Sequence, residues 1–318
     1  MPSQGGFAID LYETKMFLII AKLITLEFVC LRKGVYFVQD SSPLLVYFDT
    51  NIFDHIQKRI NVTDLDLEKL KSAITSHKLS LVFSFLNIEE ILFTLKCSPL
   101  NGRSQLSLLL EIADPKKFIV SQDLVLNEVI RSYAANTEPP IPFGICDRNT
   151  RRFLKRMTTC RSLPRDVLKI VGETRKAKQD FKARFEEGKK VLEPMARSMG
   201  GGKAYPFPKY FAGNTKWLAE SFAEKAGVLS ECRSRGINGL MDRKVLRMAV
   251  GANLSLIYSH DFEGRAPKDS DSRDMLHAVL ASSADIFVTH DSELSRILQR
   301  IEVNQFRIVD IHTLLAEF

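Results

Sequence analysis

Cysteine is scarce in this 318-residue chain. There are five cysteines, an odd number, and no two stand at the CxxC spacing of a zinc site or a redox pair. A disulfide scaffold and a cysteine-based zinc centre are therefore not expected. This usage fits a reducing environment, so we predict a cytoplasmic protein.

Long apolar runs are also missing. The most apolar stretch near the start, Met16–Leu31, is interrupted by Lys22 and Glu27 and is shorter than a membrane span needs. Acidic residues precede it, where a signal peptide would carry basic ones. We therefore predict no membrane association. Residues 1–43 are interpreted as an N-terminal extension whose role the sequence leaves open.

Two further kinds of motif are absent. Three glycines run into Lys203, but there is no GxxxxGK[ST] pattern and no strand before them, so a hinge is favoured over a phosphate-binding loop. The histidines show no HxH or HExxH spacing, which argues against a histidine zinc site, although His277 follows Asp274 by one helical turn. His290 stands beside Asp291 on an expected strand, where alternation turns it to the opposite face.

Positive charge is present in excess and is unevenly placed. The net charge is +7, which favours an anionic partner, nucleic acid before membrane. Residues 147–203 hold 17 Lys and Arg against 7 Asp and Glu, a net of +10, in a mostly helical pattern. Solvated helix faces are the alternative interpretation. The predicted nucleic-acid-binding cations are Arg151, Arg152, Lys155, Arg156, Lys176, Lys178, Lys182, Arg184 and Lys203.

The clearest structural signal is Leu44–Phe53, with the sequence LLVYFDTNIF. An apolar strand ends abruptly in Asp49, and an amphipathic helix starts straight after it, from about Asn51. In open α/β sheets, ligands bind at this carboxyl edge of the strands. Capping of the following helix is the alternative role for Asp49.

Other acids occupy similar places. A second strand, Lys78–Phe85, precedes a helix with Glu89 and Glu90 in its expected first turn, and Lys116–Gln122 is a candidate third strand. Near the end, the patterned helix Asp269–Ala284 contains Asp274 and leads into a strand that finishes at Asp291. If these strands are parallel, the acids converge on one edge of the sheet.

These residues resemble the PIN-domain ribonuclease family. The resemblance lies in Asp-Thr-Asn after the first strand, a Glu before Ile91-Leu92, and the run DMLHAVLASSADIFVTHD with its terminal Thr-x-Asp. It implies a Rossmann-like α/β fold with a central parallel sheet, and acids that bind Mg2+ or Mn2+. By position, the implied catalytic and metal-binding acids are Asp49, Glu90 (or Glu89), Asp274 and Asp291, and the supporting polar residues are Thr50, Asn51 and Thr289.

The resemblance covers two separated segments. It implies a PIN domain built from residues 44–136 and 265–318, with residues 137–264 as an inserted basic, mostly helical module. Proline-rich Thr137–Gly144 opens this insertion. Asp271, three residues before Asp274, is expected to be the N-cap of its helix, and Asp269 is likewise expected to serve as a cap.

The expected chemistry follows from the carboxylates. Oxygen ligands suit Mg2+, which can activate a water and neutralise charge on an attacked phosphate. The sequence therefore predicts a divalent-metal-dependent nuclease, an endoribonuclease before a DNA nuclease. A non-catalytic PIN-like scaffold that binds RNA or protein is the first alternative, and the toxin of a toxin–antitoxin pair is the second. A homodimer and an antitoxin-like protein partner also stay open.

Overall fold

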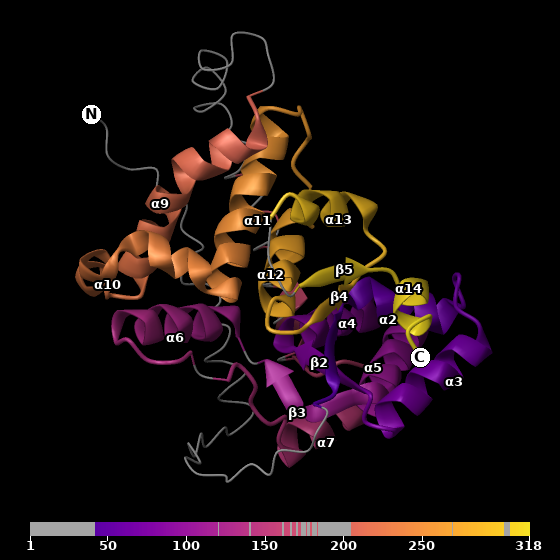
Figure 1. Cartoon of the computed structure of the whole chain (residues 1–318). Helices are drawn as coiled ribbons and strands as arrows, with labels where there is room; N and C mark the ends of the chain where they lie inside the picture. The colour runs from indigo at the N-terminus through magenta and orange to yellow at the C-terminus, as the bar shows by residue number, and fades with distance from the viewer. Residues whose placement is uncertain are drawn as a thin grey trace.

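A five-stranded parallel sheet forms the centre of the molecule (Figure 1). The computed structural model describes residues 42–119, 121–139, 141–160, 162–165, 167–169, 171–172, 176, 179, 183, 205–268, 270–301 and 306–318. Within them the strand order is β3-β2-β1-β4-β5, and every neighbouring pair is parallel. The strands are β1 (Leu44–Phe48), β2 (Leu79–Ser84), β3 (Ala113–Ile119), β4 (Ile286–Val288) and β5 (Arg307–Val309).

The strand sequences explain why the sheet is covered on both faces. All six residues of β2 are buried, as are the last three of β1. In β1, Val46 and Phe48 pack into one core, whereas Tyr47 packs into the core on the other face. Runs of this kind, apolar on both faces, are typical of parallel sheets between two helical layers.

One face of the sheet is covered by helices from both ends of the chain. Their core includes Phe48, Ile52, Leu81, Ile91 and Leu314. The helices that contribute to it are α2 (Thr50–Lys58), α3 (Asp64–Thr75), α4 (Phe85–Cys97), α5 (Pro99–Ile112), α7 (Arg148–Met157) and α14 (Ile311–Leu315).

The opposite face carries Tyr47, Val82 and Phe287 of the sheet. The helices packed there are α6 (Gln122–Ala134), α11 (Lys244–Asp261), α12 (Asp271–Ala281) and α13 (Ser292–Gln299). Within α11, Met248, Ala252 and Leu256 belong to the same core as the strand residues. This helix therefore joins the segment expected as an insertion directly to the sheet.

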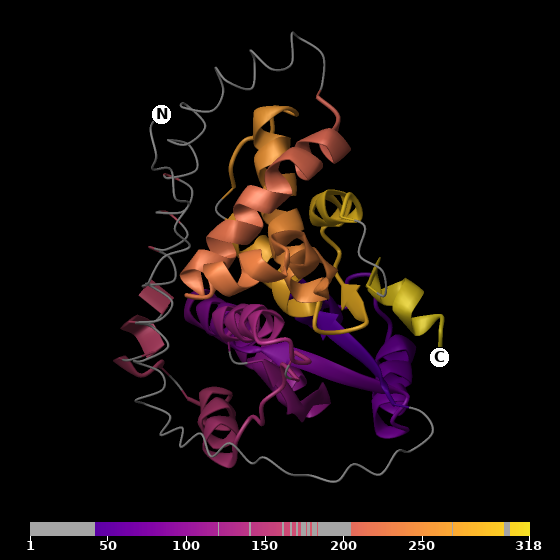
Figure 2. The same ribbon diagram turned by 60° about the vertical axis from the view of Figure 1, so that its left-hand side comes forward.

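A third core lies among helices farther from the sheet. It joins α6 and α11 to α9 (Phe207–Lys225), α10 (Leu229–Arg235) and the 3-10 helix η1 (Ile237–Asp242). Figures 1 and 2 show α9, α10 and α11 gathered on one side of the sheet and α2, α3 and α5 on the other. The domain limits given above stay a prediction.

The predicted α/β class is confirmed, with some changes in element bounds. The third strand starts three residues earlier than expected, at Ala113. Helix α4 begins at Phe85, capped by Ser84, so Glu89 and Glu90 lie in its second turn instead of its first. The stretch Met16–Leu31 lies outside the described residues. None of the helices in the described part of the chain is long and apolar enough to cross a membrane.

Candidate metal centre

The site lies where the chain changes direction across the sheet. From β1 the chain first adds β2 and β3 on one side, and later adds β4 and β5 on the other. The carboxyl ends of β1 and β4 therefore meet at a topological switch point, where ligands bind in open α/β sheets. The expected acids at these two strand ends are Asp49 and Asp291.

Asp49 follows the last residue of β1 and is 5% exposed. Although it precedes α2, its side chain makes no capping hydrogen bond. One carboxylate oxygen, Oδ2, instead accepts hydrogen bonds from Thr289 Oγ1 at 2.9 Å and from Asn51 Nδ2 at 3.2 Å. The capping role is therefore wrong, and two of the predicted supporting residues hold the carboxylate in place.

The two neighbouring glutamates of α4 have different partners. Glu89 is buried and accepts a hydrogen bond from Arg273 Nη2 of α12 at 3.0 Å. Glu90 points toward the Asp49 side, where its Oε2 lies 2.9 Å from His277 Nε2. One residue turns a helix by about 100°, which separates the two carboxylates. Of the two glutamates, Glu90 is therefore the one that lies with Asp49 and His277.

His277 of α12 completes a three-residue cluster, although it was not among the metal ligands expected from the sequence. Its Nε2 lies 4.0 Å from Asp49 Oδ1 and 3.4 Å from Thr50 Oγ1. One donor atom from each of Asp49, Glu90 and His277 lies within 4.8 Å of the other two, so these residues could hold a metal ion. The sequence signal that could have found His277 is its spacing from Asp274, because this spacing places both residues on one face of a helix.

Asp274 lies in the first turn of α12, close to the cluster. Burial raises its pKa from 3.8 to about 7, and the negative charge of Asp49 adds to this effect. With Asp291, Asp271 and Glu293 it lines a pocket between α11, α12 and α13. The third predicted acid thus stands beside the cluster, at the wall of an adjoining cavity.

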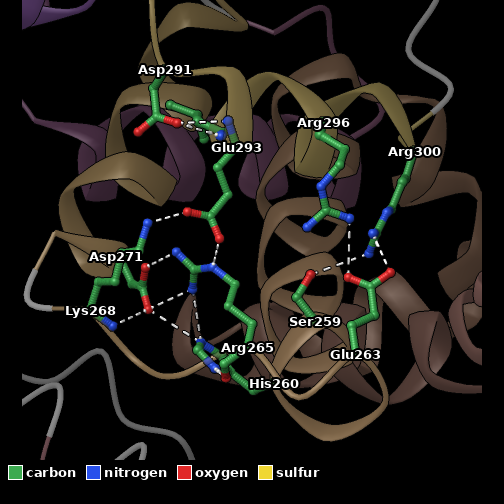
Figure 3. A network of polar contacts seen from close by, with 11 residues as sticks. Ser259, His260, Glu263, Arg265, Lys268, Asp271, Asp291, Glu293, Arg296 and Arg300 are labelled. Carbon is green, nitrogen blue, oxygen red and sulfur yellow. Dashed lines mark hydrogen bonds and ion pairs between the residues drawn. The ribbon is translucent and has the colours of Figure 1, made fainter.

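Asp291 serves two structural roles at the end of β4. Its Oδ1 caps α13 by accepting hydrogen bonds from the backbone N–H groups of Glu293 and Leu294, both at 2.8 Å (Figure 3). Its own N–H donates to Thr289 Oγ1 at 3.0 Å, the hydroxyl that also binds Asp49. The Thr289 hydroxyl therefore links the fourth acid to the first, but Asp291 is not among the three residues whose donor atoms lie within 4.8 Å of one another.

The start of α12 is held by a polar network (Figure 3). Arg265 binds both carboxylate oxygens of Asp271, at 2.5 and 2.9 Å, and also donates to Glu293. Burial opposes the charge of Asp271, but hydrogen bonds from His260 and Arg265 outweigh it and lower the pKa to about 2. The expected N-cap role of Asp271 is wrong, because Ser270 takes that position. Asp269 lies outside the described residues.

Neither His290 nor any of the predicted basic residues that the structure describes belongs to the three-residue cluster. His290 is half-buried and stacks on His55 with ring centroids 4.4 Å apart, in keeping with the expectation that it faces away from Asp291 and packs. On α7, four cations are exposed while Leu154 and Met157 are buried. We call Arg151, Arg152, Lys155 and Arg156 the α7 basic face. Lys176 is also exposed, whereas Lys178, Lys182, Arg184 and Lys203 lie outside the described residues.

The donor set and its charge fit a divalent cation. Burial and the nearby charge of Glu90 raise the pKa of Asp49. The charge of a protonated His277 and the hydrogen bonds from Thr289 and Asn51 oppose this rise. Burial disfavours a charged imidazole at His277, yet Glu90, Asp49 and Asp274 outweigh it and raise the pKa of that ring. The cluster thus concentrates negative charge in a buried place, which a bound cation would neutralise.

Comparisons with family models, with curated proteins and with solved structures found no match to this chain. The family resemblance therefore stays a prediction.

Proposed function

We propose that this chain is a divalent-metal-dependent nuclease of the PIN type that hydrolyses RNA phosphodiester bonds internally. The observation that supports it most is the cluster of Asp49, Glu90 and His277 donor atoms within 4.8 Å, at the switch point of the sheet. Asp274 and Asp291 line the adjoining pocket. These carboxylates repel a phosphate, so the arrangement can serve phosphate hydrolysis only when cations neutralise them.

The chemistry divides between the bound ion and the chain. A divalent ion held by Asp49, Glu90 and His277 would supply an activated water and neutralise charge on the phosphate. The chain's own part is to hold these donors in register. Thr289 and Asn51 fix the Asp49 carboxylate, and Thr289 also fixes the backbone at Asp291. Without cations, the carboxylates would repel an anionic backbone.

RNA is the proposed substrate because the positive charge of the chain gathers in one segment. The α7 basic face is exposed and lacks acidic neighbours in its helix sequence. Lys and Arg on such a surface bind phosphates with an affinity that falls steeply with salt. DNA shares this phosphate chemistry, so a matched DNA strand belongs in every assay.

The experiment compares the wild type with the double variant Asp49→Asn, Asp291→Asn. Both proteins are incubated with a single-stranded RNA and a DNA of the same sequence, in Mn2+, in Mg2+ and in EDTA. We expect internal cleavage of RNA by the wild type only, dependent on the cation. Asp242→Asn, a change at an exposed carboxyl, is the matched control and should cut like the wild type.

Two outcomes would contradict the proposal. Equal cleavage by the double variant would mean that another site or a contaminant is responsible. Tight RNA binding by the wild type, without cleavage under any cation, would instead support the non-catalytic scaffold.

A further inference from the structure

His277 reaches the carboxylates from a fully enclosed position. It is 1% exposed and sits on α12, between the strand-end residue Asp49 and Glu90 of α4. Its Nε2 contacts Glu90 Oε2 at 2.9 Å and Thr50 Oγ1 at 3.4 Å, and its Nδ1 contacts the Tyr47 hydroxyl at 2.8 Å. Without a cation, a proton on Nε2 makes the contact with Glu90 a hydrogen bond, and a bound cation could take the place of that proton.

A chain of buried hydrogen bonds favours one form of this ring. Asn87 donates from Nδ2 to the Phe48 carbonyl at 3.0 Å, which fixes its amide so that Oδ1 is the acceptor. The Ser84 hydroxyl donates to that Oδ1 at 3.0 Å, and the Tyr47 hydroxyl lies 2.8 Å from Ser84 Oγ. With this order of protons, Tyr47 donates to Ser84 and its oxygen accepts from the Nδ1–H of His277. When the ring carries only that proton, the lone pair is on Nε2, the form in which imidazole binds metals; when the ring carries two protons, Nε2–H donates to Glu90.

The distances around Nε2 are short enough for a shared ion. The Nε2–Oε2 distance to Glu90 is 2.9 Å, and the Nε2–Oδ1 distance to Asp49 is 4.0 Å. One donor atom from each of Asp49, Glu90 and His277 lies within 4.8 Å of the other two, so one divalent ion could contact all three.

We propose that His277 Nε2 is a direct metal ligand, that Tyr47 is its positioning residue, and that this nitrogen makes the site prefer Mn2+ over Mg2+. Imidazole suits transition metals, whereas Mg2+ is served by carboxylates and water. The inference rests on the metal site of the proposed function, but it concerns the identity of the ligands and holds whether or not the protein cuts RNA.

The first test uses the full-length wild type loaded with Mn2+ and pulsed electron paramagnetic resonance. A directly bound imidazole nitrogen modulates the electron spin echo of Mn2+. We expect this nitrogen modulation in the wild type and in His312→Gln, whose substituted residue is exposed on α14, but not in His277→Gln. Absence of nitrogen modulation in the wild type with Mn2+ bound overturns the proposal without any variant.

The second test measures competition between the two ions. Mg2+ is titrated against bound Mn2+, and the released Mn2+ is followed by its continuous-wave spectrum. In His277→Gln we expect Mn2+ affinity to fall by at least about tenfold, the loss that a change in an outer-shell partner already causes, with Mg2+ affinity almost unchanged. Circular dichroism checks that the variant is folded. An equal loss for both ions, or no loss for either, overturns the proposed preference.

Tyr47→Phe tests the positioning role, because it removes only the hydroxyl that holds Nδ1. We expect the nitrogen modulation to remain and Mn2+ affinity to drop by about tenfold. Unchanged affinity would show that Tyr47 does not position the ring. Nuclease activity is recorded separately in each case. Loss of cleavage with intact Mn2+ nitrogen modulation would count against the proposed function and leave the ligand assignment standing.

Discussion

Replacement of Asp274 by Asn should make the cation-free protein more stable at alkaline pH. In the folded protein, burial and the charge of Asp49 raise the pKa of Asp274 from 3.8 to about 7. Such a carboxyl holds its proton more tightly in the folded state than in the unfolded state. The stability of the wild type therefore falls as the pH rises from about 3.8, and the loss is complete once the pH passes about 7.

The size of the effect follows from the shift. Between pH 5 and pH 7 the unfolded carboxyl is ionised and the folded one is protonated, and each pH unit costs about 1.4 kcal/mol. The wild type should thus lose about 3 kcal/mol, relative to Asp274→Asn, when the pH changes from 5 to 8. Asparagine has no such proton to lose, so its contribution at this position is constant.

The assay is urea denaturation in EDTA at pH 5, 6, 7 and 8, with both proteins measured side by side. Asp242→Asn is the control for loss of an exposed carboxyl and should follow the wild type. Addition of Mn2+ at pH 8 should close the gap, because a ligand at a hundred times its Kd stabilises the folded state by about 2.7 kcal/mol. If the wild-type and Asp274→Asn curves run parallel across this pH range, the reasoning about Asp274 is refuted.

Three further predictions concern the support of the site and its surroundings. Glu89→Gln should destabilise the protein by about 3–5 kcal/mol, because it removes the carboxylate that pairs with buried Arg273. The double change Glu89→Leu, Arg273→Met removes both charges and should cost much less stability in urea denaturation. Equal losses of stability in the two variants would contradict this. Gly102→Ala should lower stability by about 1–3 kcal/mol, since an added Cβ would lie 2.3 Å from the Leu95 backbone. Gly213→Ala, with open space around it in α9, should instead gain about 0.5–1 kcal/mol, and matching thermal shifts for the two would disprove the packing argument. Replacement of the four cations of the α7 basic face by Glu should weaken RNA binding. The slope of log K against log salt concentration should become less steep by about 0.7 for each RNA phosphate that the protein no longer neutralises. An unchanged slope would mean that this face is only solvated surface.

Much of the scaffold could be predicted from the chain itself. The apolar run before Asp49 predicts a buried strand because such a sequence is typical of parallel sheets that are covered on both sides. Strand alternation predicts that His290 faces away from Thr289 and Asp291, and its stacking on His55 agrees with this. Bounds were less accurate, since Ser84 and Asn87 form a capping box that starts α4 earlier than the acid pattern suggested.

What the sequence by itself determined is local: the order of strands and helices, and the acids delivered at their ends. Tertiary structure decided which of these groups meet. Glu89 and Glu90 are adjacent in the chain, but Arg273 of α12 pairs with the first and His277 of the same helix contacts the second. His277 enters the cluster only because α12 packs over β1, where the Tyr47 hydroxyl turns its ring. Coordination depends on distances of a few ångströms between segments more than 180 residues apart, and helix packing alone sets those distances.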